Sequence, residues 1–428
     1  MNIKRRIARF LTSTLLTKIK YGIADAKRVI GRAPHEVHYF HQVDDPYSHL
    51  MAQVLHAFEN AYNVKLIVHL VNPPTDDIAP DRQDLIDYSR RDAEKISPYH
   101  NLSFTDPGAQ PSDEALHMAR RALAGSSKRS KAAAKIGEAY WKNNIQALRN
   151  MSLVSPKETE AIFANGTKKR DSLGHYLGAM VYYGGEWYWG VDRLPYLEER
   201  LTNARLRHAN YRQVTHFQTR PGFMTKPAKG RLTVEYFPSA RSPYSYVSIE
   251  ETLDLPNHYP VDLVVRPVLP MVMRGLPVPQ RKGRYIVRDT KREAERIGVP
   301  FGNIFDPVGK PVERLYSLFP KANAQGKGLD LFAAFCQMAW AEGRDVGSDD
   351  GLRAVVARAG LEWEYMQDVL DTEDWRAEME KNRLDLVDLG LWGVPSYRLL
   401  NDKGEVIFSC WGRDRVWLLA CEIQKALT

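Results

Sequence analysis

The sequence is poor in cysteine and has no long apolar run. It contains three cysteines in 428 residues, Cys336, Cys410 and Cys421, and no two have the C-x-x-C spacing of a dithiol redox site. Three cysteines are also too few for a disulfide framework, which favours a cytoplasmic or otherwise reducing compartment. Because no run of about 18 apolar residues occurs, we expect no membrane-spanning helix. These features disfavour a disulfide oxidoreductase, a disulfide-rich secreted protein and an integral membrane protein.

The sequence also has little net charge beyond its first 32 residues. The chain has 60 Lys and Arg against 52 Asp and Glu, a formal net charge of +8. Residues 1–32 hold nine basic side chains and one acid, Asp25, and so account for the whole surplus. Because the rest of the chain is balanced, we expect no nucleic acid as a partner. A hydrophobic content of 44% instead predicts a globular protein of two or three domains.

Residues 1–32 have the pattern of a basic amphipathic helix. Leu11, Leu15, Ile19 and Ile23 are spaced by four residues, which places them on one stripe of a helix. Three interpretations stay open. The stripe packs on the body of the protein, or the helix binds a membrane surface or an acidic partner, or it is an organelle transit peptide. The second interpretation makes the protein peripheral at the membrane surface.

The chain resembles itself when it is shifted by 197 residues. Residues 37–92 align with 234–289 without a gap, and 18 of 56 positions are identical. Chance gives about three or four identities. The G-x-D-R segment at 190–193 recurs at 412–415, an offset of 222, so the second half has 25 extra residues. We interpret this repeat as a tandem duplication.

Each half has the same order of expected elements. A short strand leads through a P-Y-S turn into a helix, followed by a second strand, a charged helix-rich region, a hairpin and a last helix. This order predicts a mixed sheet covered by helices, an α/β fold. The expected strands are 37–40, 64–71, 177–183 and 186–189 in the first half and 234–237, 261–268, 396–400 and 405–411 in the second. Helices are expected at 284–297, 329–342 and 349–360. The expected segments are a basic helix at 1–32, a diverged domain at 33–212, a linker at 213–230 and a domain at 231–428 with the site.

Four motifs in the second half stand beside these elements. R-S-P-Y-S-Y follows the first strand and K-G-R-Y follows the second, W-G-V-P-S precedes the hairpin and W-G-R-D-R closes it. In this order they resemble the DsbA-like thioredoxin-fold group. Within that group they are most similar to the kappa-class glutathione transferases and the 2-hydroxychromene-2-carboxylate isomerases. The resemblance covers about 229–428 well and 33–205 as a diverged copy.

The resemblance implies two tandem thioredoxin-like domains, each with an inserted helical subdomain, and glutathione as the cofactor. It implies that Ser242 hydrogen-bonds the glutathione sulfur and favours its thiolate. The Val394–Pro395 peptide bond is then cis, and the backbone of Val394 pairs with the cysteinyl part of glutathione. Asp414 is expected to hold the γ-glutamyl amine, beside a cation, Arg413, that the family's turn does not usually have.

Two residues of the expected long helix, Lys282 and Tyr285, complete the implied site. Lys282 is expected to meet a carboxylate of glutathione or of the substrate. Tyr285 is expected to line an apolar pocket together with two aromatic residues of the insertion, Phe335 and Trp340. Cys336, in the same apolar run, is expected to be a buried filler.

Elementary chemistry supports these roles but also allows simpler ones. A thiol has a pKa near 8.5, and a hydroxyl donor at a helix N-terminus stabilises the thiolate by hydrogen bond and dipole. Ser242 is also a plausible N-cap. In the same way, Pro395 fits an ordinary strand entry, Asp414 and Arg415 fit an exposed ion pair, and Lys282 fits a solvated lysine.

The first half departs from the pattern at three of these positions, whereas the G-x-D-R turn survives intact at 190–193. Asp45 replaces the serine, Leu85 replaces the lysine, and Tyr176 or Leu177 stands where we expect the cis-proline. A carboxylate repels a thiolate and cannot donate while it is ionised. We therefore interpret the first half as having lost this glutathione site. A metal site is also disfavoured, because His38 and His41 would point to opposite faces of one strand.

Two functions follow. The first is a glutathione-dependent isomerase or transferase that acts on a small apolar, aromatic electrophile. The alternative is a non-catalytic scaffold of two thioredoxin folds that binds glutathione or a protein. In both cases we expect the two domains to pack on each other within the chain.

Overall fold

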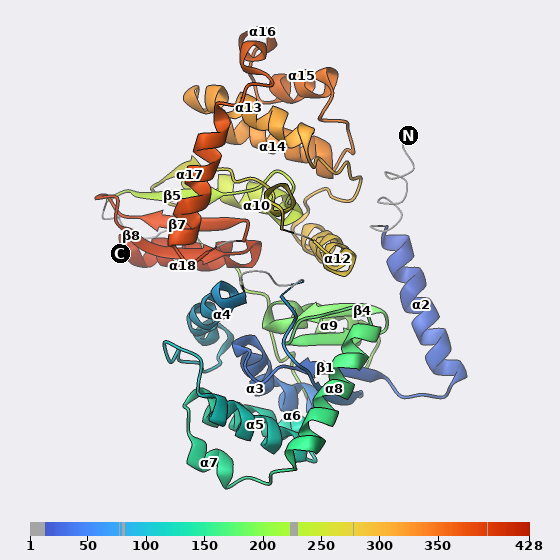
Figure 1. Cartoon of the computed structure of the whole chain (residues 1–428). Coiled ribbons are helices and arrows are strands. Elements are labelled where there is room, and N and C mark those ends of the chain that lie inside the picture. The colour runs from blue at the N-terminus through green and yellow to red at the C-terminus, as the bar shows by residue number, and fades with distance from the viewer. Residues whose placement is uncertain (1–12, 77, 79–81, 223–229, 277, 392) are drawn as a thin grey trace. The chain divides into compact units, whose positions relative to one another are not determined.

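The computed structural model describes residues 13–76, 78, 82–222, 230–276, 278–391 and 393–428 (Figure 1). Residues 1–12, which belong to the predicted basic helix, lie outside this part of the chain. The chain forms two compact units, Lys18–Gln218 and Thr219–Thr428, and residues 13–17 are grouped with the second. The boundary between the units falls inside the segment 213–230 that the sequence indicates as a linker.

The first unit contains a mixed sheet with the strand order β2-β1-β3-β4. β1 and β2 are parallel, whereas β3 runs antiparallel to both β1 and β4. The strands are β1 Glu36–His41, β2 Lys65–Leu70, β3 Met180–Tyr183 and β4 Glu186–Trp189. The helices are α2 Thr14–Ile30, α3 Pro46–Ala61, α4 Arg82–Ile96, η1 Ser97–His100, α5 Asp113–Gly125, α6 Arg129–Trp141, α7 Ile145–Arg149, α8 Pro156–Ser172 and α9 Gly190–Asn203.

The second unit contains a sheet of the same topology, with the strand order β6-β5-β7-β8. Here β5 and β6 are parallel, and β7 runs antiparallel to β5 and β8. The strands are β5 Leu232–Phe237, β6 Val261–Val265, β7 Ser396–Leu400 and β8 Val406–Trp411. The helices are α10 Pro243–Leu253, α11 Leu255–His258, η2 Met271–Arg274, α12 Gln280–Ile297, α13 Lys310–Ala324, α14 Gly328–Trp340, α15 Asp349–Arg358, α16 Trp363–Met366, η3 Gln367–Val369, α17 Trp375–Asp388, η4 Arg413–Arg415 and α18 Val416–Leu427.

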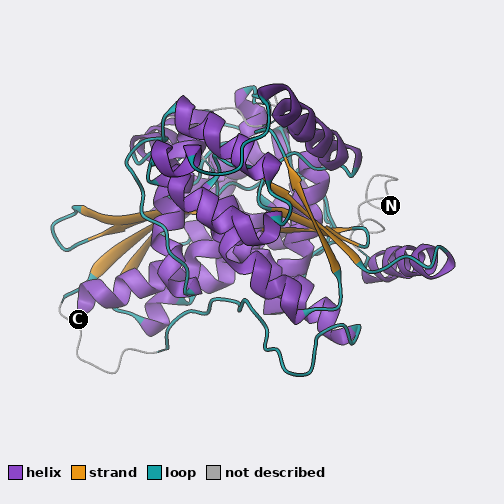
Figure 2. Ribbon diagram, turned by 90° about the horizontal axis from the view of Figure 1, so that it is seen from below, coloured by secondary structure: helices purple, strands orange, loops and turns teal. Residues whose placement is uncertain are grey.

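Helices flank the strands in each unit, so the predicted mixed α/β architecture is confirmed (Figure 2). In both units a long helical segment separates the parallel strand pair from the hairpin. α4 to α8 occupy this place in the first unit and α12 to α17 in the second. The first hairpin turns through Gly184 and Gly185, with φ of 51° and 87°. Positive φ at both positions is what a two-residue turn needs, and glycine adopts it without steric cost.

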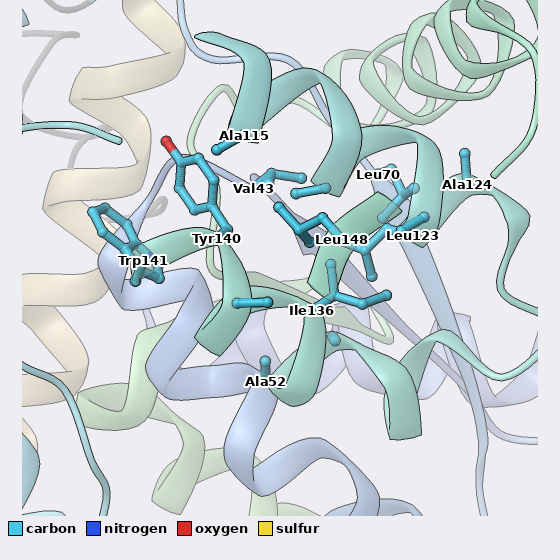
Figure 3. Close-up of a cluster of buried hydrophobic side chains, with 14 of the residues drawn as sticks. Val43, Ala52, Leu70, Ala115, Leu123, Ala124, Ile136, Tyr140, Trp141 and Leu148 are labelled. Carbon is cyan, nitrogen blue, oxygen red and sulfur yellow. The ribbon is translucent and has the colours of Figure 1, made fainter. Parts of the chain in front are cut away.

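The helical segment of the first unit packs through alanines, branched side chains and aromatic rings (Figure 3). Ala115, Ala119 and Leu123 recur every four residues on α5 and are fully buried. Alanine at the contact lets α5 approach α6 closely, and Leu148 and Phe163 close the cluster. Full burial of a leucine side chain contributes about 1.5–3 kcal/mol. This cluster anchors the inserted helices to β2 and α3 through Leu70 and Ala52.

The hydrogen bonds of the two units match at the positions of the 197-residue sequence repeat. In each unit a tyrosine of the first strand donates to a carbonyl of the following helix, and a serine hydroxyl of that helix accepts a backbone N–H. The tyrosine bonds are Tyr39 to Ser48 O at 3.1 Å and Tyr236 to Ser245 O at 2.8 Å. The serine bonds are Gln42 N to Ser48 Oγ and Ser239 N to Ser245 Oγ, at 3.2 Å each. A third matching pair joins a tyrosine to an aspartate, Tyr47 to Asp92 and Tyr244 to Asp289, at 2.8 Å each.

The strand register corrects one sequence alignment. In the first unit Phe40 pairs with Met180, and in the second Phe237 pairs with Ser396. The residue before Met180 is therefore the counterpart of Pro395.

That counterpart is Ala179, so the prediction of Tyr176 or Leu177 for the cis-proline position is wrong. The first hairpin has a shorter loop than the second. The offset between matching residues of the two halves therefore changes inside the hairpin, and the offset of the G-x-D-R segment does not apply before it. The backbone confirms the match, because Gly190 N–H donates to Ala179 O and Gly412 N–H donates to Pro395 O, both at 2.8 Å.

The expectation that the apolar stripe of the N-terminal helix packs on the body is wrong for the described residues. Ile19, Ile23 and Ile30 on α2 are 45%, 51% and 84% exposed. None of the described helices combines the length and the apolar character needed to cross a bilayer.

Candidate functional site

Ser242 stands at the N-terminus of α10, where it caps the helix. Its Oγ accepts the N–H of Ser245 at 3.1 Å, and Pro243 occupies the first helical turn, where a missing N–H has no cost. The capping role that the sequence allowed is therefore real. It leaves the hydroxyl proton for a second partner. The positive end of the helix dipole is at this point, so an anion beside Ser242 Oγ would be stabilised.

The second partner of Ser242 is the backbone of Val394. Ser242 Oγ donates to Val394 O at 3.4 Å, across 152 residues of chain. The Val394–Pro395 peptide bond is cis, as the resemblance implied. The structure therefore brings together two of the predicted site residues, Ser242 and Val394. Trp392 of the same motif lies outside the described residues.

The loop that precedes Ser242 is held by side chains of the helical segment. The N–H of Ala240 donates to Tyr316 OH at 3.3 Å, and Ala240 O accepts the indole N–H of Trp340 at 3.1 Å. Trp340 and Phe335 are both buried. Trp340 therefore has a structural role at this loop, and the expectation that the two rings line a substrate pocket stays a prediction. Cys336 is fully buried, as predicted, and burial raises the pKa of its thiol, which keeps it protonated.

Lys282 and Tyr285 lie on the face of α12 that turns toward α10. Tyr244, two residues after Ser242, donates its hydroxyl to Asp289 Oδ2 at 2.8 Å and so links the two helices. Positions 282, 285 and 289 share one helical face. Lys282 is half-buried, and this burial lowers the pKa of its ammonium group. The structure thus places Lys282 and Tyr285 on the helical face that Asp289 shares.

Arg413 has a different environment from the one that the sequence suggested. Its guanidinium is buried and forms ion pairs with Glu293 of α12 and, at 2.9 Å, with Glu251 of α10. These carboxylates neutralise the charge that we expected to meet a ligand. Arg413 therefore ties the G-x-D-R turn to two helices. Its first-unit counterpart, Val191, carries no charge, which is the only signal in the sequence that this arginine is not part of a repeated anion site.

Asp414 follows directly on the β7–β8 hairpin, two residues after Gly412. Because Gly412 N–H donates to Pro395 O, the turn of Asp414 lies next to the Val394–Pro395 segment. Arg415 is buried and its Nη1 donates to the backbone O of Asp414 at 3.0 Å. Arg415 is therefore not the exposed side chain that the sequence allowed. Arg193, the matching residue of the first unit, is buried in the same way.

One residue near the site was missed in the sequence. Arg241, which directly precedes Ser242, forms two hydrogen bonds of 2.8 Å with the carboxylate of Asp306. Such a paired geometry fixes the planar guanidinium and with it the start of α10. No sequence signal connects these residues, because 65 positions and a folded segment separate them.

The corresponding place in the first unit is occupied by a carboxyl group. Asp45 caps α3, where it accepts the N–H groups of Tyr47 at 3.2 Å and Ser48 at 3.0 Å and the hydroxyl of Ser48 at 2.7 Å. Burial, opposed by the Ser48 hydrogen bond and assisted by the charge of Asp44, raises the pKa of Asp45 to about 6. Near neutral pH Asp45 is thus largely ionised, and this cap repels a thiolate.

His38 and His41 of the first unit do not converge on one site. His38 and His41 lie three residues apart in β1 and point to opposite faces. His38 Nδ1 is 3.0 Å from His69 Nε2, whereas His41 Nδ1 is 3.2 Å from the hydroxyl of Tyr39. Within the described residues, no group of three His, Cys, Asp or Glu side chains is placed to hold a metal ion.

Comparison with known proteins gives a family for the second unit. Residues 233–424 match the model of the DSBA-like thioredoxin domain. No curated protein matches the sequence.

Two solved structures show the extent of the structural similarity. A 2-hydroxychromene-2-carboxylate isomerase is 19% identical with a TM-score of 0.38, and covers 45% of this chain and 95% of its own. The cytosolic disulfide reductase DsbM of Pseudomonas aeruginosa is 20% identical with a TM-score of 0.34, and covers 45% of this chain and 98% of its own. Similarity of this size carries no information on activity or substrate. The family match alone supports the statement that residues 233–424 of this chain are a DSBA-like thioredoxin domain.

Proposed function

We propose that the unit Thr219–Thr428 is a glutathione-dependent isomerase or transferase of the 2-hydroxychromene-2-carboxylate isomerase and kappa-class type. The observation that carries this proposal is the position of Ser242. Its hydroxyl group caps α10, and the proton that it donates to Val394 O over 3.4 Å can be donated to an incoming thiolate instead. A hydroxyl donor at a helix N-terminus, next to backbone that can pair with a peptide, suits a peptide thiolate.

The residues present fit glutathione in chemical type. Ser242 would donate its hydroxyl proton to the sulfur, and the backbone of Val394 would pair with the cysteinyl residue. The carboxylate of Asp414 suits the γ-glutamyl ammonium group, and Lys282 suits a carboxylate. Arg413 is left out of this set because two glutamates already bind it.

Glutathione would supply a thiolate that adds to an electrophilic carbon of the substrate and then either stays, as in transfer, or leaves again, as in isomerisation. The contribution of the chain is to hold this sulfur ionised and fixed. Hydrogen bonds to charged groups contribute about 1.5–3 kcal/mol, which corresponds to a lowering of the thiol pKa by about one to two units. An apolar, aromatic electrophile is the proposed substrate class, with Tyr285 at its binding surface.

The first unit is proposed to be a duplicated copy without this activity. The shared sheet topology and the matching hydrogen bonds support a common origin. The carboxyl group of Asp45 gives this unit no donor for a thiolate while it is ionised. A non-catalytic, scaffolding role is therefore the proposal for the unit Lys18–Gln218.

The experiment is a titration of the full chain with glutathione, followed by calorimetry and by the ultraviolet absorbance of the bound thiolate. We expect Ser242→Ala to bind glutathione more weakly, to raise the pKa of the bound thiol and to lose about 10- to 100-fold in conjugation of a chlorodinitrobenzene. Asp45→Ala is the matched control at the other cap and should change none of these values. Absence of glutathione binding, or an unchanged thiol pKa in Ser242→Ala, contradicts the proposed function.

A further inference from the structure

The N-terminal helix α2 presents two different sides. Arg200 places its guanidinium carbon 3.4 Å above the ring of Tyr21, and Arg200 Nη1 donates to Tyr183 O at 2.9 Å. Tyr21, Ala24 and Arg28 are only partly exposed, so this side of α2 is the one that meets the protein. The helix thus already has a body-facing side, made of aromatic and polar groups.

The opposite side of α2 is apolar and exposed. With 3.6 residues per turn, positions 15, 19, 23, 26 and 30 fall within an arc of about 80°, roughly opposite Tyr21. These positions hold three isoleucines, one leucine and one alanine, and all five are exposed. Together they define the α2 stripe, which runs along a helix of 17 residues, about 25 Å long. An apolar stripe of this length that turns away from the body marks a binding surface.

The basic side chains around the α2 stripe indicate which kind of partner binds it. Lys27 lies beside the stripe and is exposed, and residues 1–32 carry nine basic side chains against one acid. A second copy of the chain would bring two strongly basic segments together, which like-charge repulsion opposes. A negatively charged bilayer satisfies both features at once, because the apolar side chains enter the acyl boundary while the lysines stay at the headgroups.

We propose that α2 binds the surface of an anionic lipid bilayer through the α2 stripe. The helix then lies in the plane of the interface, and the contact of Tyr21 with Arg200 couples it to the first unit. This surface is independent of the glutathione site and needs no catalysis.

The test is co-sedimentation of the full-length protein with vesicles. Vesicles of phosphatidylcholine with about one part in four phosphatidylserine should retain the protein, and vesicles of phosphatidylcholine alone should retain far less. Added salt should weaken the binding, because it screens the lysines. If the anionic vesicles retain no protein, the proposal is wrong.

Variants locate the binding on the α2 stripe. Ile23→Glu should weaken vesicle binding by about tenfold or more, because the burial of one isoleucine is lost. Lys27→Gln should weaken it by about fivefold. The matched control is Leu384→Glu, which changes a leucine of α17 that is 48% exposed, and it should bind as the unchanged protein does. Ile23 is itself exposed, so folding should be preserved, and circular dichroism checks this.

Two results overturn the assignment. Equal losses in Ile23→Glu and Leu384→Glu would show that binding does not use the α2 stripe. A concentration-dependent dimer that Ile23→Glu abolishes, without vesicle binding, would assign the stripe to a second copy of the chain. Light scattering of the free protein detects that case.

Discussion

At the N-terminus of α3 the capping atom is a carboxylate oxygen of Asp45, and at the N-terminus of α10 it is the hydroxyl oxygen of Ser242. Both atoms accept the N–H of the residue three positions later, Ser48 or Ser245. Both therefore cap their helix at the same position, and Asp45 also accepts the N–H of Tyr47. They differ in what they offer a ligand, because an ionised carboxylate only accepts whereas a hydroxyl also donates. The fold thus tolerates either residue, and only the second is suited to an anion.

The segment opposite each cap differs in the same sense. In the second unit Val394 and Pro395 stand there, and Pro395 has no N–H. In the first unit Gly178 and Ala179 stand there, and the N–H of Ala179 donates to Ser48 Oγ at 2.9 Å. The first unit therefore closes this place with its own hydrogen bonds. The comparison teaches that two sheets of one topology can differ, at the residue before β3 or β7, in whether the backbone has an N–H to donate to the neighbouring helix.

The largest effect is expected from exchanging the two caps. Ser242→Asp keeps a good N-cap, so the fold should survive, but it replaces the donor by a negative charge. We expect glutathione conjugation to fall by at least about 100-fold, more than in Ser242→Ala, because repulsion is added to the lost hydrogen bond.

The reverse exchange, Asp45→Ser, should create no glutathione binding, because Ala179 lacks the geometry of the Val394–Pro395 segment. Calorimetry with glutathione measures both variants. If Ser242→Asp retained full activity, the functional difference between the two caps would be refuted.

A smaller effect is expected when Gly178 of the first unit receives the valine side chain of its counterpart in the second unit, Val394. A Cβ on Gly178 would stand 2.6 Å from Gln42 Cβ and 3.1 Å from Asp45 Oδ2. Gly178→Val should therefore lower the free energy of unfolding of the first unit by about 1–3 kcal/mol through overpacking. Gly222→Val is the control, because no atom lies within 4 Å of its added Cβ. Hydrogen exchange resolved by peptide measures each unit, and an equal response of both variants would contradict close packing at Gly178.

The last prediction concerns the pH dependence of stability and the Asp45 cap only. Burial raises the pKa of Asp45 to about 6, above the value of about 3.9 in an unfolded chain. The folded unit therefore holds this proton more tightly. The stabilisation that this bound proton gives the folded unit is complete below about pH 4 and is lost as the pH rises through about 6. The free energy of unfolding then falls by at most about 1.4 kcal/mol per pH unit.

Asp45→Asn removes this titration, so its unfolding free energy should change less between pH 4 and pH 6 than that of the unchanged protein. Urea unfolding at both pH values measures the difference. Ser242 does not titrate in this range, and Ser242→Asn should leave the pH dependence of its unit as it was. Parallel pH profiles of Asp45→Asn and the unchanged protein would refute the raised pKa of Asp45.

Local patterns predicted much of the architecture. Alternating apolar residues placed the strands to within a few positions, for example 234–237 against the observed Leu232–Phe237. The Gly184–Gly185 turn fixed the first hairpin, since glycine alone adopts both positive φ values readily. Proline after a polar cap marked the starts of α3 and α10. These features depend on neighbours in the chain, which is why the sequence shows them.

Long-range contacts were predicted less well. The sequence placed Arg413 near a ligand, but Glu251 and Glu293 bind it in the folded chain. It did not predict that the indole N–H of Trp340 donates to Ala240 O. Both side chains are chemically able to take either role. The choice depends on which groups the fold brings within a few ångströms.

The sequence by itself determined the strand and helix order, the repeat of 197 residues and the identity of the two caps. Local propensity and side-chain chemistry suffice for each of these. Only the tertiary structure decided that Ser242 meets Val394, that Ala179 is the counterpart of Pro395, and that the α2 stripe faces away from the body. Each of these depends on strand register or on which face of an element is covered, and packing between distant segments sets both.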